Sequence, residues 1–239
     1  MAAPAVLSNL GRVALDLLFP PRCVLCGRHG AALCDACTAT LPRADPPRCP
    51  RCWSPQRPGS GCRRCDESAC GGLALAGLRS PYVFQGGARE LVHALKYHYH
   101  SALASPMGEL MARYLRGDSL PADVLAPVPL HPHRQRARGY NQSFLLAREV
   151  SRRLDLPLAA AALVRRNDTP PQARASEANA RRRNVADAFD CRPGAVDGRR
   201  VLLVDDVTTT GATLDACARA LLAKGGASSV WALTFARED

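Results

Sequence analysis

Four Cys-x-x-Cys pairs near the amino terminus constrain the fold of this chain more than any other feature of its sequence. Two thiolates separated by two residues can bind one zinc ion from a single turn, and two such pairs complete a tetrahedral site. The surrounding segment is rich in proline and arginine and has little apolar periodicity, so it needs cross-links of this kind to fold. The pairs are Cys23/Cys26, Cys34/Cys37, Cys49/Cys52 and Cys62/Cys65.

The spacers of 7, 11 and 9 residues between successive pairs leave their grouping open. We favour neighbouring pairs, which give one site from the first two pairs and another from the last two. An interleaved arrangement and a single occupied site are the alternatives. Because four protein ligands close a zinc site, we expect one or two structural zinc ions rather than a catalytic one. We also expect a cytoplasmic protein, since such pairs are typically metal ligands there and not disulfides.

Composition divides the 239-residue chain near residue 70. Beyond that point apolar strand-like segments alternate with helical periodicity, which predicts an α/β domain with a parallel sheet. We expect a helix and a double zinc ribbon over residues 1–70 and the α/β domain over 71–239. No segment is apolar over the roughly 20 residues that a membrane span requires. The predicted strands are 123–128, 158–164, 200–204 and 229–235, and the predicted helices are 87–96, 105–115, 140–154 and 213–224.

The chain is strongly basic, with a formal net charge of +11. Only two of its 32 basic residues are lysines, Lys96 and Lys224, and the rest are arginines. Arginine presents a planar fork of N–H donors that matches phosphate oxygens. This charge favours an anionic partner, either nucleic acid or a phosphorylated small molecule, although a basic protein without such a partner is also compatible with it.

The segment 201–213, VLLVDDVTTTGAT, carries the clearest functional signal. An apolar strand ends in Asp205 and Asp206, a loop of threonines and glycine follows, and a helix begins at once. Backbone N–H groups in such a loop and at a helix N-terminus form an anion cradle. The two carboxylates suit ribose hydroxyls or a Mg²⁺ held through water. The candidate phosphate-binding residues are Thr208, Thr209, Thr210, Gly211, Ala212 and Thr213.

This segment resembles the motif with which type I phosphoribosyltransferases bind phosphoribosyl pyrophosphate (PRPP). The wider chain resembles the ComF family, in which a double zinc ribbon precedes a phosphoribosyltransferase-like domain. The resemblance also rests on Leu95-Lys96-Tyr97 and on the segment 127–142, and it covers residues ~17–236. It implies a type I phosphoribosyltransferase-like parallel sheet flanked by helices, with a hood segment near residues 71–116. Tyr140, where phenylalanine is common, is a mild departure.

The resemblance also implies roles for individual residues. Asp205 and Asp206 would bind the ribose of Mg²⁺-bound PRPP, and residues 208–213 its 5′-phosphate. A loop expected to close over PRPP covers residues 165–183. The diphosphate candidates are Arg134, Arg136, Arg138 and Lys96, for which a basic surface loop or a salt-bridged helix end would be the alternative. The candidates from the closing loop are Gln172, Arg181, Arg182, Arg183 and Asn184.

Two functions are compatible with this resemblance, and both link the chain to natural competence, DNA uptake or DNA processing. The first is transfer of the phosphoribosyl group from Mg²⁺-bound PRPP to a nitrogen nucleophile, with no residue that identifies the acceptor base. The second is binding of single-stranded DNA, with the PRPP site regulatory or vestigial. A competence helicase or other DNA-processing proteins are then the candidate partners. Few aromatic residues near the basic stretches offer a surface on which bases could stack.

Overall fold

The computed structural model describes residues 21–57, 60–62, 73–97, 100–166 and 188–239. Its main sheet has the strand order β1-β7-β6-β3, with β2 also paired to β7, and every pairing is parallel. This confirms the predicted fold class. The strands are β1 (Gly77–Arg79), β2 (Tyr82–Val83), β3 (Val124–Pro127), β6 (Arg200–Thr208) and β7 (Ser229–Arg237).

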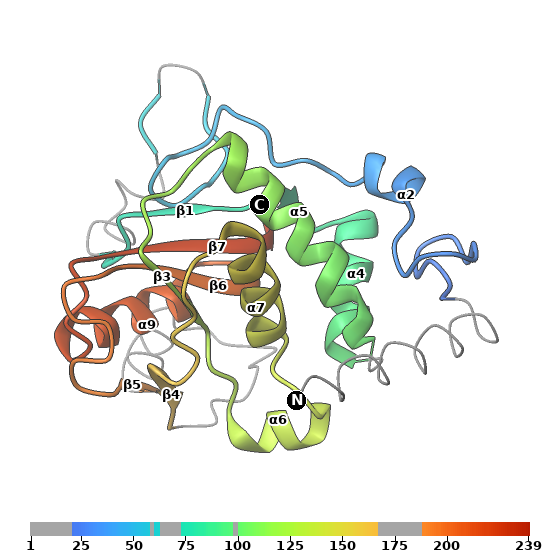
Figure 1. Cartoon of the computed structure of the whole chain (residues 1–239). Helices are drawn as coiled ribbons and strands as arrows, with labels where there is room; N and C mark the ends of the chain where they lie inside the picture. Colours follow the sequence, from blue (N-terminus) through green and yellow to red (C-terminus); the bar gives the residue numbers. More distant parts are fainter. Residues whose placement is uncertain (1–20, 58–59, 63–72, 98–99, 167–187) are drawn as a thin grey trace, which may run out of the picture.

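Helices cover both faces of this sheet (Figure 1). One face carries α4 (Gly86–Tyr97), α5 (Ala104–Gly117) and α7 (Gln142–Leu154), and the other carries α9 (Ala212–Ala223). Shorter elements are α2 (Asp35–Ala39), the 3-10 turn η1 (Ser101–Leu103) and α6 (Pro132–Arg138). No helix in the described part of the chain has the length and hydropathy that a membrane crossing needs.

Strand β6 runs through the middle of the core and explains the layered arrangement. Its residues Leu202 and Val204 pack among α4, α5 and α7, while Val201 and Leu203 pack towards α9. A strand of a parallel sheet that is buried on both faces reads as a continuous apolar run, which is how the sequence 201–204 reads.

Two boundaries differ from those predicted. β6 continues to Thr208, because its pairing with β7 extends to the partners Thr208 and Arg237. Asp205 and Asp206 therefore lie within the strand and not beyond its end. The predicted strand 158–164 is reduced to β4 (Leu163–Arg165), which pairs antiparallel with β5 (Phe189–Cys191) in a separate two-stranded sheet.

The segment 71–116, expected as a hood, contributes to the main layers of the domain. β1 and β2 pair with β7, and α4 and α5 cover one face of the sheet. The cysteine-rich region lies against these same elements, with residues 21–40 beside α4 and the following segment over β1 (Figure 1). The approach is close at Gly77, where a Cβ would lie 2.9 Å from the carbonyl oxygen of Pro50.

Candidate functional site

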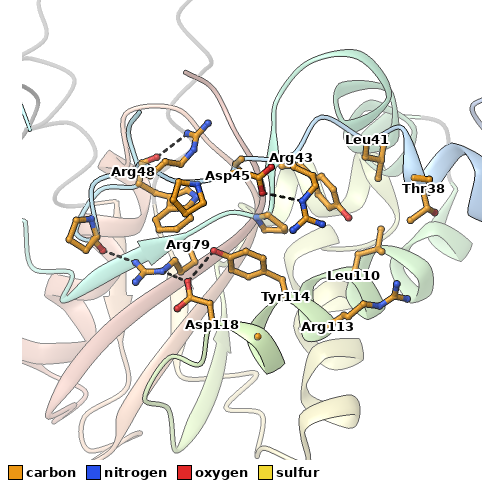
Figure 2. A pocket seen from close by; sticks show the side chains of 18 of the residues that line it. Thr38, Leu41, Arg43, Asp45, Arg48, Arg79, Leu110, Arg113, Tyr114 and Asp118 are labelled. Carbon is orange, nitrogen blue, oxygen red and sulfur yellow. Dashed lines mark hydrogen bonds and ion pairs between the residues drawn. The ribbon is translucent and has the colours of Figure 1, made fainter. Parts of the chain in front are cut away.

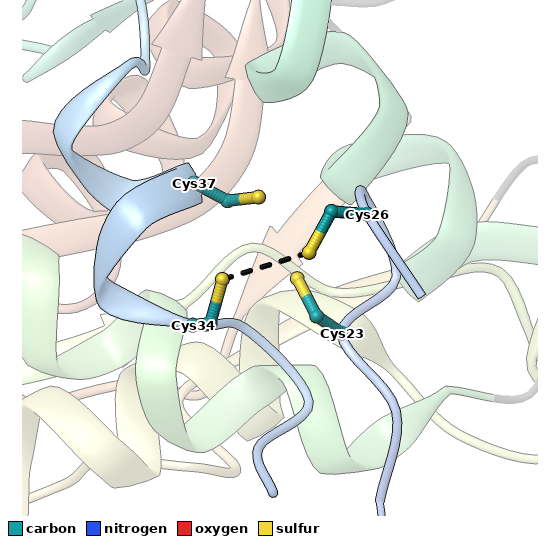
Figure 3. A group of neighbouring side chains, drawn as sticks. All are labelled: Cys23, Cys26, Cys34 and Cys37. Atoms are coloured by element: carbon teal, nitrogen blue, oxygen red, sulfur yellow. Dashed lines mark hydrogen bonds between the residues drawn. The ribbon is translucent and has the colours of Figure 1, made fainter. Parts of the chain in front are cut away.

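The first cysteine cluster brings four sulfurs together from two short segments. The Sγ atoms of Cys23, Cys26, Cys34 and Cys37 all lie within 4.8 Å of one another (Figure 3). The sulfurs of Cys26 and Cys34 are 3.7 Å apart. Tetrahedral zinc with Zn–S bonds of ~2.3 Å places its sulfurs about 3.8 Å apart, so the four thiols fit a zinc ion. The neighbouring grouping of the first two pairs is confirmed.

The thiols of this cluster are electrostatically unequal before any metal binds. Burial opposes ionisation of Cys23, but hydrogen bonds from the backbone at Cys34, Cys26 and Leu25 lower its pKa to about 6. Hydrogen bonds with the side chains of Cys26 and Cys34 raise the pKa of Cys37 to about 12. At neutral pH the cluster therefore already holds a thiolate, which is the form that binds zinc.

A second cluster contains the buried residues Cys49, Cys52 and Cys62, whose sulfurs also lie within 4.8 Å of one another. The sulfurs of Cys52 and Cys62 are 3.5 Å apart, again close to the spacing that zinc imposes. The predicted fourth ligand, Cys65, lies outside the described residues. The described members of each cluster come from neighbouring pairs, and the spacing of their sulfurs supports structural zinc in this region.

The two adjacent acids of β6 are buried and are held by different partners. Asp205 is 8% exposed, and its Oδ1 accepts a hydrogen bond of 2.6 Å from the hydroxyl of Ser143, at the start of α7. Asp206 is 2% exposed, and its Oδ2 lies 3.1 Å from the ammonium of Lys96, in the last turn of α4. Two helices from the same face of the sheet thus fix the two carboxylates.

This environment changes the acidity of Asp205. Burial is the main cause, and repulsion from the Asp206 carboxylate adds to it, so the pKa of Asp205 rises to about 7. The Ser143 hydroxyl and the Lys96 ammonium act in the opposite direction but do not cancel this effect. Asp205 therefore exchanges its proton near neutral pH, as acidic groups at functional sites often do.

The loop after β6 leads directly into α9. Gly211 is the N-cap of α9 and has a φ of +84°, a left-handed conformation that glycine adopts without strain. Gly211 has no side chain to cap this helix, and the Thr210 hydroxyl accepts only from the N–H of Ala212, at 3.3 Å, so other N–H groups of the first turn remain available to an anion. Thr208 is buried, and its Oγ1 has no hydrogen-bond partner among the described residues. Thr209 and Thr210 are exposed, and Ala212 and Thr213 are half-buried.

The predicted diphosphate residues do not form one cluster. Arg134, Arg136 and Arg138 lie on α6 and not in a loop. At 100° per residue, Arg134 and Arg138 share one face of that helix, whereas Arg136 points to the other side. Arg138 donates a hydrogen bond of 2.6 Å to Gln142, and Lys96 is held by Asp206 at the end of its helix.

Comparisons with known proteins agree with this architecture. Residues 141–238 match the phosphoribosyl transferase domain, and residues 14–66 match the double zinc ribbon domain. The DNA utilization protein YhgH of Escherichia coli O157:H7 is 34% identical over 231 residues, which cover 91% of this chain and 98% of that protein. The competence protein ComFC of Bacillus subtilis is 29% identical over 210 residues, which cover 86% of this chain and 84% of that protein. The chain belongs to the ComF family.

Solved structures similar to this ComF-family protein include phosphoribosyltransferases. The glutamine PRPP amidotransferase from B. subtilis, complexed with ADP and GMP, has a TM-score of 0.41 and is 18% identical. The match covers 59% of this chain and 30% of that enzyme. The adenine phosphoribosyltransferase from Leishmania tarentolae has a TM-score of 0.33 and is 20% identical, over 54% of both chains.

In this ComF-family protein the segment after β3 joins three elements around the acids. The Tyr140 hydroxyl donates a hydrogen bond of 2.6 Å to the carbonyl of Leu95 in α4. Asn141 caps α7 and donates from its amide to the carbonyl of Val128, which follows β3. The sequence analysis treated this segment as a diphosphate-binding loop, with a basic surface loop as the alternative, and did not identify Ser143. The available signal was the position of Ser143 directly after the segment 127–142, on which the resemblance rests.

The candidates from the closing loop lie outside the described residues. Arg165 and Arg166, at the start of that segment, are described. Arg165 lies over the ring of Phe189, with 5.2 Å between the guanidinium carbon and the ring centroid, and Arg166 forms an ion pair with Asp190. These two arginines are thus held by β5. The candidates outside the described residues are Gln172, Arg181, Arg182, Arg183 and Asn184.

Proposed function

We propose that this ComF-family protein binds PRPP where β6 meets α9 and that it serves DNA uptake or utilisation in the cytoplasm. The names of its relatives, a DNA utilization protein and a competence protein, support the cellular role. The two clusters of free cysteines support a reducing compartment. The observation that carries PRPP binding is the pair Asp205 and Asp206, held by Ser143 and Lys96 beside the N-terminus of α9.

Each part of this site matches one part of PRPP. Carboxylate oxygens accept hydrogen bonds from ribose hydroxyls, which suits Asp205 and Asp206. Backbone N–H groups of α9 and the hydroxyls of residues 208–210 donate to the 5′-phosphate. Carboxylate oxygens are also the ligands that Mg²⁺ prefers, so the same acids fit the Mg²⁺ that accompanies PRPP. Arg134 and Arg138, on one face of α6, remain our candidates for the diphosphate.

Phosphoribosyl transfer is the reaction that this site would support. A nitrogen nucleophile forms a bond to C1 of the ribose, and the bond between C1 and the diphosphate oxygen breaks. The diphosphate leaves with the bonding electron pair. The protein would contribute orientation and electrostatic stabilisation rather than a covalent intermediate.

Binding of single-stranded DNA is the second candidate function, and one row of side chains favours it. Phe84 and His93 have ring centroids 6.0 Å apart, and His93 and Tyr97 5.9 Å apart. The guanidinium of Arg138 lies 5.2 Å from the Tyr97 ring centroid, and Tyr97 is 63% exposed. Rings and guanidinium planes of this kind stack on bases without regard to sequence. A competence helicase or other DNA-processing proteins would then be partners.

Thermal unfolding with and without Mg²⁺ and PRPP tests the main proposal. PRPP should stabilise the parent protein by about 2.7 kcal/mol at a hundredfold excess over its Kd. The double variant Asp205→Asn, Asp206→Asn and the exposed Thr209→Val should lose most of this stabilisation. Asp155→Asn is the matched control, because this exposed acid has a left-handed backbone conformation that asparagine tolerates. Equal stabilisation of the parent and the double variant would contradict the assignment.

Inorganic phosphate separates the two halves of the site. Its weak binding should survive the double acid variant, because it carries no ribose, and should weaken in Thr209→Val. Oligothymidylate binding, titrated with and without PRPP, tests the second function. If a Tyr97→Ala variant binds oligothymidylate as tightly as the parent at the same salt concentration, the row of rings is excluded as the DNA-binding surface.

A further inference from the structure

A groove separates the cysteine-rich region from the α/β domain and involves none of the residues assigned above to PRPP. Its volume is about 1090 Å³, and it is lined by residues within the segments 35–53, 79–82 and 110–118 (Figure 2). α4, α6 and the segment 205–213 do not contribute to it. The volume is sufficient for a ligand of nucleotide size, since small-molecule sites measure roughly 300–1,000 Å³.

The floor of the groove is built from paired groups and is fixed in place. The Arg79 guanidinium lies 4.5 Å from the ring centroid of Trp53, and its Nε donates a hydrogen bond of 2.7 Å to Asp118. The Tyr114 hydroxyl donates to the same carboxylate at 3.2 Å, as Figure 2 shows. The Trp53 indole N–H donates to the carbonyl of Ser80 at 2.8 Å. Because Arg79 and Asp118 neutralise each other, this pair shapes the groove, and other residues determine the net charge of the groove.

Tyr82 lines the groove and can offer its hydroxyl to a ligand there. The residue is only 7% exposed, and its ring packs against Phe235 with centroids 5.0 Å apart. No hydrogen bond of the Tyr82 hydroxyl is found among the described residues, and its oxygen is not one of their fully buried unpaired atoms, so it keeps access to the groove that Tyr82 lines. A ligand in the groove could therefore accept a hydrogen bond from this hydroxyl.

Two arginines set the charge around this hydroxyl. Burial raises the pKa of Tyr82, and the positive charges of Arg43 and Arg113 oppose that rise. Both side chains line the groove and are exposed. Arg43 also contacts Asp45 at 3.1 Å, but both groups are more than 60% exposed. Exposed pairs are weak, so a phosphate could displace this carboxylate.

We infer that the groove binds a phosphorylated small molecule of nucleotide size, whose phosphate contacts Arg43, Arg113 and the Tyr82 hydroxyl. Guanidinium groups bind phosphate oxygens through paired N–H donors, and the phenol O–H adds a third donor. The apolar side chains of Leu41 and Leu110 line the same groove and suit the organic part of the ligand. This site does not depend on PRPP binding.

Photolabelling with 8-azido-AMP, followed by peptide mapping, tests the inference. Label should appear on peptides from residues 35–53, 79–82 or 110–118, and inorganic phosphate should compete for it. Arg43→Gln and Arg113→Gln should each weaken labelling about tenfold, since each removes a charged donor. Tyr82→Phe should weaken it less and keeps the ring packed on Phe235. Arg89→Gln, an exposed arginine of α4 away from the groove, is the control and should label like the parent.

Each contrary result overturns a stated part of the inference. Label confined to residues 205–219, or unchanged labelling in all three groove variants, would exclude the groove as a site. Competition by acetate as strong as that by phosphate would exclude phosphate as the recognised group. If oligothymidylate competes with the photolabel at far lower concentrations than AMP does, the groove binds nucleic acid, which would contradict a small-molecule ligand. Labelling of the variant Asp205→Asn, Asp206→Asn should stay unchanged, which separates this result from the fate of the PRPP proposal.

Discussion

Arg237, in the last position of β7, donates a hydrogen bond of 2.7 Å from its guanidinium to the carbonyl oxygen of Cys52. The same guanidinium donates to the Ser54 hydroxyl at 2.9 Å, and the side chain is 1% exposed. Arg237 is also the sheet partner of Thr208, the first residue of the predicted phosphate loop. One strand end therefore contacts both the second cysteine cluster and the candidate PRPP site.

Replacement of Arg237 should destabilise the whole domain. Arg237→Gln removes two charge-assisted hydrogen bonds in a buried position, so we expect a loss of about 2–3 kcal/mol in the free energy of unfolding. Urea denaturation measures it. Arg219→Gln is the control, because Arg219 is 54% exposed and its ion pair with Asp215 spans one helical turn. That variant should lose less than about 1 kcal/mol. Equal losses in the two variants would contradict the role given to Arg237.

Purified protein should contain one to two zinc ions per chain. Cys23→Ser and Cys49→Ser should each lower the zinc content, because each removes one ligand of a four-ligand site. Mass spectrometry under native conditions measures the stoichiometry. Cys191→Ala, at a buried cysteine outside both clusters, should keep the zinc content of the parent. Trace zinc in the parent, together with a melting temperature unchanged by chelation, would rule out structural zinc.

Lys96 should stabilise the fold through Asp206. Lys96→Met removes the only ammonium near a 2% exposed carboxylate among the described residues, and loss of one partner of a buried pair costs about 3–5 kcal/mol. A double-mutant cycle with Asp206→Asn measures the coupling. The double variant should be more stable than Lys96→Met alone, because asparagine needs no counter-ion. Additive losses would show that the two side chains do not interact.

Stability should depend on pH through Asp205. Its pKa is about 7 in the folded protein and ~3.9 in an unfolded chain, so the folded state binds the proton more tightly. The contribution of Asp205 to the free energy of unfolding is therefore greatest below pH ~4. It falls as the pH rises towards 7, by at most about 1.4 kcal/mol per pH unit. Urea denaturation between pH 5.5 and 8 measures the slope.

The variant Asp205→Asn isolates this contribution. Relative to the parent, it should lose less stability across the same pH range, since asparagine does not titrate. Asp155→Asn, at an exposed acid, should keep the slope of the parent. A parent and an Asp205→Asn variant with parallel pH profiles would show that Asp205 keeps its ordinary acidity.

Local patterns in the sequence were enough for most elements of the fold. The apolar run 201–204 predicted a buried strand, and helical periodicity placed α4, α5, α7 and α9 within a few residues of their observed bounds. Strand ends were less predictable, because pairing with a neighbour decides them. β6 extends through both acids only because β7 continues beside it to Arg237.

The sequence by itself determined how chemical groups that are close together along the chain are arranged. The neighbouring grouping that we favoured is the one that the described sulfurs adopt, and the segment 201–213 predicted a strand, a glycine turn and a helix N-terminus in that order. Metal binding by a Cys-x-x-Cys pair and the capping of a helix both depend on residues a few positions apart, so both can be predicted from the sequence alone.

Contacts between distant segments were decided only by the tertiary structure. Three such contacts join residues that are 62, 110 and 185 positions apart in the chain. They are the contacts of Ser143 with Asp205, Lys96 with Asp206 and Arg237 with Cys52. Their partners depend on which strands lie side by side and how two helices cross the sheet. Burial then makes each pair strong, because water no longer competes for the charges. The groove that holds Tyr82 exists for the same reason, as its walls come from three separate parts of the chain.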